Sequence, residues 1–137
     1  MGGDVRGIGF SGTRAGMTGP QLQTVEMLLL ANAGSRFHHG DCVGADAQAH
    51  DIAIRAKLVV YIHPPTDKSL RAFKQGWMAK PLSYLARNRD IVDATQELIA
   101  APMEADEQPK GGTWSTIRYA RKVGKPVTIV RPDGTTL

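Results

Sequence analysis

Two glycines and three hydroxyl side chains stand close together in residues 111–116, which read GGTWST. The apolar run 97–101 before them is typical of a buried strand, and Ile117, Ala120 and Val123 after them keep helical spacing. Glycines let a ligand approach the backbone, and the unpaired N–H groups of a helix start favour an anion. The segment therefore predicts a phosphate-binding loop. The simpler alternative is that the glycines only turn the chain and Thr113 caps the helix.

Two further glycine segments follow expected strands, at residues 11–16 (SGTRAG) and 40–46 (GDCVGAD). Residues 7–12 also match the dinucleotide pattern G-x-G-x-x-G. That pattern needs a complete strand before its first glycine and an acid about 20 residues further on, which here would fall inside a helix. We therefore assign the loop role to residues 11–16. Three such loops at one edge of a sheet favour a nucleotide-type pocket.

Side chains that could bind a metal or react are concentrated in residues 38–50. Neighbours in a strand point to opposite faces, so His38 and His39 cannot easily reach one ion, and we predict no metal site. Asp46 and His50 share a helical face. Either a hydrogen bond here fixes the start of the helix, or Asp46 accepts from a ribose hydroxyl. Cys42 near a helix start could have a lowered pKa, but no base in the sequence supports it as a nucleophile.

Strand patterns recur along the whole chain and alternate with helix patterns. An alternation of this kind predicts a parallel sheet covered on both faces, with ligands bound beyond the carboxyl ends of its strands. We predict an α/β fold, a Rossmann-like doubly wound parallel sheet of five strands in the order 3-2-1-4-5, in a single domain of residues 1–137. The expected strands are 5–10, 35–39, 57–62, 97–101 and 125–130.

The helices expected between these strands have recognisable starts. Residues 18–21 (TGPQ) fit a capping box, and residues 45–56 carry small side chains suited to close packing on a sheet. A short helix is expected in residues 66–80 and another from residue 81, whereas residues 102–110 form a polar, flexible loop. Leu70, Phe73 and Trp77 share one side of the first of these helices, and this apolar side, in excess of what one core needs, favours a homodimer. Leu82, Leu85 and Val92 are expected to face inward from the second.

Composition narrows the possible partners. The 137 residues carry a net charge of +4, which mildly favours phosphorylated or polyanionic partners, but no run of lysines and arginines is present. Aromatic residues make up only 6%, few for a platform that stacks single-stranded bases. The single cysteine and the lack of a signal-peptide pattern or of an apolar run of about 20 residues predict a cytoplasmic protein without a membrane segment.

Four segments, in this order, resemble motifs of the DNA-processing protein A family. Residues 9–14 (GFSGTR) resemble its opening GSR loop, and residues 39–50 (HGDCVGADAQAH) resemble its segment SGxAxGIDxxAH. Residues 87–92 (RNRDIV) resemble RNRIIA, and the helix start at residue 112 resembles SGSLxTAxxA. The resemblance covers residues 5–130 and extends to the SLOG superfamily, which joins this family with YpsA-like and Lonely-Guy-like proteins.

The resemblance implies three functions. YpsA-like members, which fit this chain length best, imply binding of a nucleotide or a nucleotide-derived ligand. Lonely-Guy-like members cleave the N-glycosidic bond of nucleoside 5′-monophosphates with a loop glutamate. Here that position falls on Ile117 or Arg118, so Asp46 or Glu104 would have to serve as the acid or base. DNA-processing protein A implies binding of single-stranded DNA.

We therefore expect a nucleotide-binding protein, with enzymatic activity left open, no cofactor and no metal. The expected partner is a nucleotide or nucleotide-derived small molecule, with a single-stranded nucleic acid as the alternative. A second copy of the chain is expected in a homodimer. Trp114 is the better of the two tryptophans for stacking on a base, since Trp77 is expected in the core. The expected ligand-binding residues are Ser11, Gly12, Thr13, Arg14, Gly40, Asp41, Gly44, Asp46, Arg87, Asn88, Gly111, Gly112, Thr113, Trp114, Ser115 and Thr116.

Overall fold

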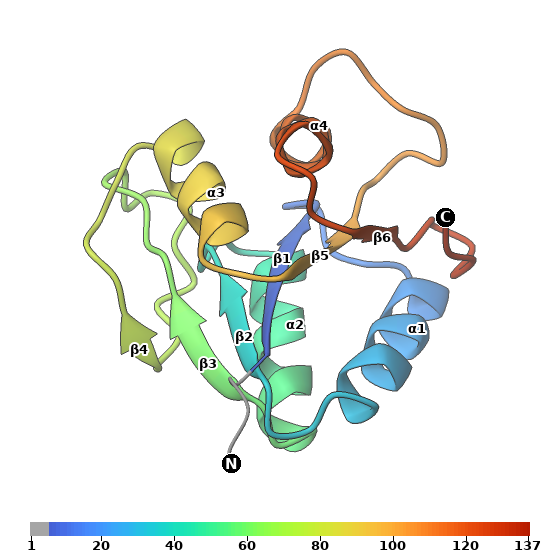
Figure 1. The fold of residues 1–137 in the computed structure, drawn as a ribbon, viewed down its shortest axis with the longest axis horizontal. Coiled ribbons are helices and arrows are strands. Elements are labelled where there is room, and N and C mark those ends of the chain that lie inside the picture. The colour runs from blue at the N-terminus through green and yellow to red at the C-terminus, as the bar shows by residue number, and fades with distance from the viewer. Residues whose placement is uncertain (1–5) are drawn as a thin grey trace.

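The computed structural model describes residues 6–137, which form a six-stranded parallel sheet with helices on both faces (Figure 1). The strand order is β4-β3-β2-β1-β5-β6. The strands are β1 (Gly7–Gly12), β2 (Arg36–His39), β3 (Val59–Ile62), β4 (Trp77–Met78), β5 (Glu97–Ala101) and β6 (Val127–Ile129). The helices are α1 (Gly19–Leu30), α2 (Ala45–Arg55), α3 (Tyr84–Asp93) and α4 (Gly112–Lys122).

The α/β class and the parallel sheet predicted from the sequence are confirmed, and the five expected strands lie in the expected relative order. The detail differs at one edge, where β4 adds a sixth strand beside β3. The first strand also runs to Gly12 rather than ending at Phe10, and its expected start at Val5 lies outside the described residues. Gly12 pairs with Ala101 of β5, so both strands end at the same level.

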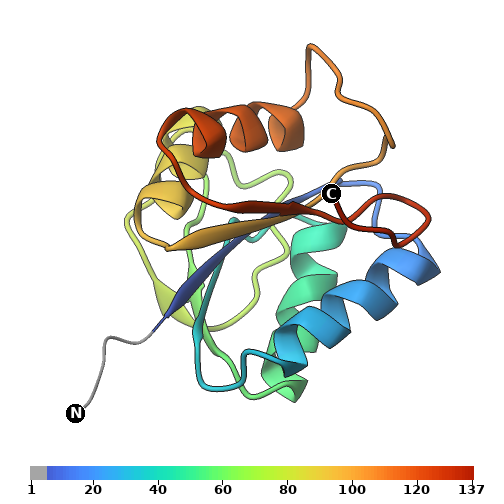
Figure 2. The same cartoon turned by 45° about the vertical axis from the view of Figure 1, so that its right-hand side comes forward.

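Helices α1 and α2 pack together on one face of the sheet, and α3 and α4 cover the other (Figures 1 and 2). The capping box expected at the start of α1 is present, with Thr18 and Gln21 each bonding the other's backbone N–H group. Alanines on the inner side of α2 are buried and allow close approach to the sheet. A second apolar cluster lies under α4 and includes Ile117 and Ala120.

The prediction of a short helix in residues 66–80 is wrong. The carboxylate of Asp41, itself fully buried, accepts from the Arg71 side chain and from the Lys74 backbone N–H group, both at 2.9 Å. Phe73 between them has a φ of 57°, which a right-handed helix does not allow. Contacts with a distant residue thus override the helical spacing. Trp77, expected in the core, is 66% exposed in the edge strand β4.

The next helix begins at Tyr84 rather than at residue 81 and turns a different face inward than expected. Leu85 is 54% exposed, whereas Arg87 is buried together with Val92. The arginine can face inward because backbone oxygens receive its donors. Hydrophobic spacing alone does not reveal such a buried charge.

Two further expectations concern the surface. None of the helices in residues 6–137 is long and apolar enough to cross a membrane. The homodimer remains a prediction. Of the apolar side chains that suggested it, Phe73 and Trp77 are 59% and 66% exposed, but they do not lie on a common helix.

Candidate functional site

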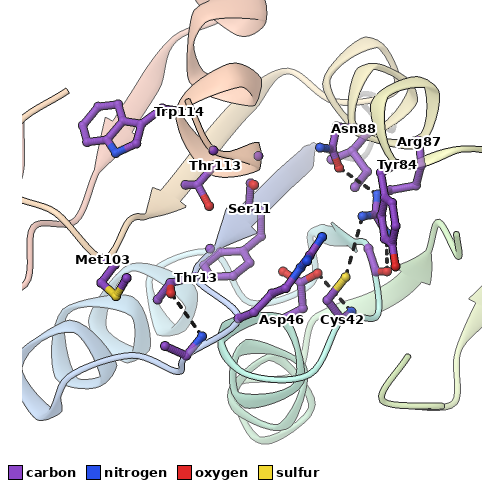
Figure 3. A pocket seen from close by; sticks show the side chains of 18 of the residues that line it. Ser11, Thr13, Cys42, Asp46, Tyr84, Arg87, Asn88, Met103, Thr113 and Trp114 are labelled. Atoms are coloured by element: carbon purple, nitrogen blue, oxygen red, sulfur yellow. Dashed lines mark hydrogen bonds between the residues drawn. The ribbon is translucent and has the colours of Figure 1, made fainter. Parts of the chain in front are cut away.

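A cavity of about 400 Å³ opens at the carboxyl edge of the sheet, between the loops after β1, β2 and β5 and the helix α3 (Figure 3). Its volume lies in the range of small-molecule sites. Of the expected residues, it is lined by Ser11, Gly12, Thr13, Arg14, Gly40, Asp46, Arg87, Asn88, Gly111, Gly112, Thr113 and Trp114, and also by Glu104.

Four expected residues do not line this cavity. Asp41 is fully buried and anchors the segment after β3. Gly44 has a φ of 87°, and a side chain there would collide with the backbone of Arg14. Ser115 points to a neighbouring cavity, and the Thr116 hydroxyl donates to the Gly112 carbonyl at 2.8 Å. These four residues shape the site or its surroundings.

The first turn of α4 faces the cavity without a side-chain cap. The residue at its N-cap is Gly111, and the first intrahelical bond runs from the Ser115 N–H group to the Gly111 carbonyl. Thr113 lies inside the helix, so the alternative in which it caps the helix is wrong. Side chains cap α1 and α3, whereas α2, like α4, begins at a glycine without a side-chain cap. The N–H groups of the first α4 turn are therefore available to an anion.

Arg87 joins the elements around the cavity. Its guanidinium donates to the carbonyls of Gly40 and His63, to the Asn88 side chain at 2.7 Å and to Cys42 Sγ at 3.7 Å. A side chain at residue 40 would overlap this guanidinium, which explains the glycine there. Most donors of Arg87 are thus already used, so its main role is to position the loop after β2.

Tyr84 is a lining residue that the sequence analysis missed. Two guanidinium groups lie over its ring, with the Arg14 Cζ atom at 5.0 Å and the Arg87 Cζ atom at 5.4 Å from the ring centroid. Lys110 and Met103 were missed as well. Two signals were available: Tyr84 stands three residues before Arg87 on one helical face, and Lys110 directly precedes Gly111. Arg14 and Lys110 are exposed and can bring positive charge to an anion.

Asp46 and Cys42 lie opposite Thr113 and Trp114 in the cavity (Figure 3). Burial raises the pKa of Asp46 to about 6, although the nearby Arg87 and the Cys42 N–H group, 3.2 Å away, oppose the rise. Burial likewise raises the pKa of the Cys42 thiol. The lowered thiol pKa considered from the sequence is therefore wrong, and Cys42 is a neutral thiol at neutral pH.

All four histidines of the chain are buried and form two pairs. His39 Nδ1 accepts from the Asp41 N–H group, so its Nε2–H donates to His50 Nδ1 at 3.0 Å. His50 thus bonds to His39 rather than to Asp46, and Asp46 fixes the start of α2 by accepting from the Cys42 N–H group. The other pair joins His38 and His63 at 2.8 Å. Within residues 6–137 no group of three or more potential ligands could hold a metal ion.

Trp114 is anchored rather than free to stack. It is only 3% exposed, and its indole N–H group donates to Glu104 at 2.9 Å. The ring packs in the cluster under α4 and offers the cavity only a small part of its surface. Its contact with Glu104 ties the loop after β5 to the start of α4.

The fold and the cavity define a doubly wound α/β protein with a small-molecule-sized site at the carboxyl edge of its parallel sheet. The fold is similar to that of the molybdenum cofactor binding protein from Rippkaea orientalis, with a TM-score of 0.73, 22% identity, and coverage of 93% of this chain and 77% of that one. It is also similar to that of the molybdenum cofactor carrier protein from Chlamydomonas reinhardtii, with a TM-score of 0.67 and 21% identity. This similarity covers 92% of this chain and 76% of that one.

DNA processing protein A from Helicobacter pylori, whose structure describes a single-stranded DNA binding mode, has a TM-score of 0.61 and 22% identity. The similarity covers 90% of this chain and 64% of that one. No protein-family model matches the sequence, and no curated protein does. At these low identities, the structural similarity shows the fold alone. Because DNA processing protein A is among the similar structures, the resemblance drawn from the sequence motifs is confirmed at the level of the fold.

Arg87→Ala should lower the free energy of unfolding by about 2–4 kcal/mol, because buried carbonyl groups lose their donors. Urea unfolding followed by circular dichroism measures the change. Arg89→Ala is the matched control, an exposed arginine on the same helix, and should cost no more than about 1 kcal/mol. Equal losses in the two variants would contradict the positioning role of Arg87.

Asp46→Asn should change how stability depends on pH. With a folded pKa of about 6 against an ordinary 3.8, the folded protein holds this proton more tightly than the unfolded chain does. The contribution of Asp46 to stability therefore falls as pH rises from about 4 to 6 and is constant above that. Asparagine keeps an acceptor and removes the charge. Urea unfolding from pH 4 to 8 should show the variant gaining on the wild type across this window; a constant difference would refute the assignment.

Proposed function

We propose that the protein binds a nucleotide or a nucleotide-derived molecule, with a phosphate at the first turn of α4. The observation that carries this proposal is the uncapped helix start at the wall of a cavity of about 400 Å³. Free N–H groups and the helix dipole favour a negative charge there. Arg14 and Lys110 line the same cavity and are exposed. They can complete the neutralisation of a phosphate.

The local geometry at Gly112 supports this location for the phosphate. A Cβ atom on Gly112 would meet nothing closer than the Asn88 side-chain nitrogen at 3.9 Å, so packing of the protein does not require glycine there. Gly111 differs, because its φ of 107° favours glycine for conformational reasons. Close approach of a ligand to the backbone is a reason for glycine at residue 112 that the protein's own packing does not supply.

The similar structures support a phosphate-bearing ligand. Two of these proteins are named for the molybdenum cofactor that they bind or carry, and the third has a single-stranded DNA binding mode. Both kinds of ligand carry phosphate groups. A phosphate group, which both kinds of ligand contain, fits the start of α4 and the cations of this cavity better than an uncharged ligand would.

Gly112→Val should lower the affinity for nucleoside monophosphates at least tenfold, or about 1.4 kcal/mol, because its side chain occupies the place of the phosphate. Gly19→Val is the matched control: Gly19 is the first residue of α1, and nothing lies within 4 Å of a Cβ there. Thr113→Ala should cost about 1 kcal/mol, since the backbone donors remain. Calorimetry with a panel of nucleotides measures all three. Unchanged affinity in folded Gly112→Val would place the phosphate elsewhere.

A second candidate function is hydrolysis of the N-glycosidic bond of a nucleoside monophosphate. The observation that favours it is Asp46, whose raised pKa of about 6 suits an acid or base near neutral pH and whose side chain lines the cavity. Glu104 lies at the same cavity but is held by Trp114.

If this activity exists, wild-type protein should release free base from nucleoside monophosphates, and Asp46→Asn should reduce the rate at least about a hundredfold while the nucleotide still binds. Chromatography of the products measures the release. Glu104→Gln serves as the comparison variant. Binding without any release of base would leave the protein as a binding module.

A further inference from the structure

A second cavity of about 200 Å³ lies between α3 and α4. Its walls include Asn88 and Arg89 from α3 and Ser115, Tyr119 and Lys122 from α4. None of the functions considered so far uses these residues as a group. Figure 2 shows the two helices side by side above the sheet.

Three cations line the second cavity, and the Asp93 carboxylate borders it, accepting from the Tyr119 hydroxyl at 2.7 Å. The Arg89 guanidinium lies 5.2 Å from the centroid of the Tyr119 ring. Within residues 6–137, neither Arg89 nor Lys122 forms an ion pair. Arg118, which also lines this cavity, instead pairs with Glu107 at 3.2 Å. Two exposed cations beside an aromatic ring suit an anion that also has a flat, apolar part.

The two cavities meet at Asn88, which lines both. Its side-chain oxygen accepts from Arg87 Nε at 2.7 Å, which leaves its NH₂ group to face Gly112. On the other helix, Gly112 and Thr113 line the first cavity and Ser115 lines the second. A phosphate at the start of α4 would therefore lie between the two cavities.

We propose that the groove between α3 and α4 is a second nucleotide subsite, so that the protein takes a dinucleotide. One nucleotide lies in the larger cavity with its phosphate at Gly112 and Thr113. The other lies against Arg89, Tyr119 and Lys122. This inference rests on the proposed function and specifies its ligand as two nucleotides joined by a phosphodiester.

The dimensions favour a dinucleotide over a long strand. The second cavity holds about 200 Å³, half the volume of the first, and offers one aromatic ring. A strand binder usually presents a series of such rings along a basic groove. Here Arg118 is already committed to the loop before α4, donating to the Gln108 carbonyl at 2.8 Å. The two remaining cations of this cavity, Arg89 and Lys122, suffice to bind one additional nucleotide.

The test is calorimetry at low salt with AMP, the 5′-phosphorylated dinucleotide pApA, and a longer oligoadenylate, together with the guanine counterparts. Wild-type protein should bind a dinucleotide at least tenfold more tightly than the mononucleotide, or about 1.4 kcal/mol. Arg89→Ala and Lys122→Ala should remove most of this gain and leave mononucleotide affinity unchanged. Lys80→Ala, an exposed cation outside both cavities, is the matched control and should change neither affinity.

Each other outcome has a distinct meaning. Equal affinities for mono- and dinucleotides, or a gain that survives both substitutions, would overturn the second subsite and leave the proposed function standing. Affinity that keeps rising with strand length and falls steeply with salt would replace the dinucleotide by a nucleic-acid strand. Failure of every mononucleotide and dinucleotide to bind would remove the proposed function and this inference with it.

Discussion

The buried guanidinium of Arg87 is the interaction on which the site depends. A charge of this kind is stable in the interior only when its donors are satisfied, and here backbone carbonyls after β2 and β3 satisfy them. The same contacts fix the loop that carries Cys42 and Asp46 and hold α3 against the sheet edge. Because Arg87 also raises the local positive potential, it keeps the rise in the pKa of Asp46 smaller than burial alone would make it.

Much of the fold could be predicted from local patterns. The strand at residues 97–101 and the helix start at residue 112 match the structure, because apolar runs and glycine-bounded helices are strong local signals. The segment 66–80 could not be predicted, since distant contacts with Asp41 determine its path. The burial of Arg87 could not be predicted either. Its partners include backbone atoms of other loops, and the spacing of side chains in the sequence carries no information about them.

The glycines of the site serve two purposes that look alike in a sequence. Gly12 packs so closely on α2 that a Cβ would lie 2.5 Å from that of Ala45, and Gly40 makes room for Arg87. These positions are required by the fold itself. Gly112 borders open space. Glycine-rich loops in the sequence therefore locate the edge of the sheet correctly. Only the packing around each glycine shows whether the fold requires it or whether a ligand would.

The first turn of α4 combines an open backbone with firmly anchored side chains. Trp114 and Thr116 are 3% and 2% exposed and are held by hydrogen bonds to Glu104 and Gly112. The N–H groups of this turn consequently point in fixed directions before any ligand arrives. Donors that are already ordered add little entropic cost to binding, so a modest number of contacts can give useful affinity. Because this turn is rigid, a ligand that extends past Asn88 into both cavities gains binding free energy from each of them without the helix having to move.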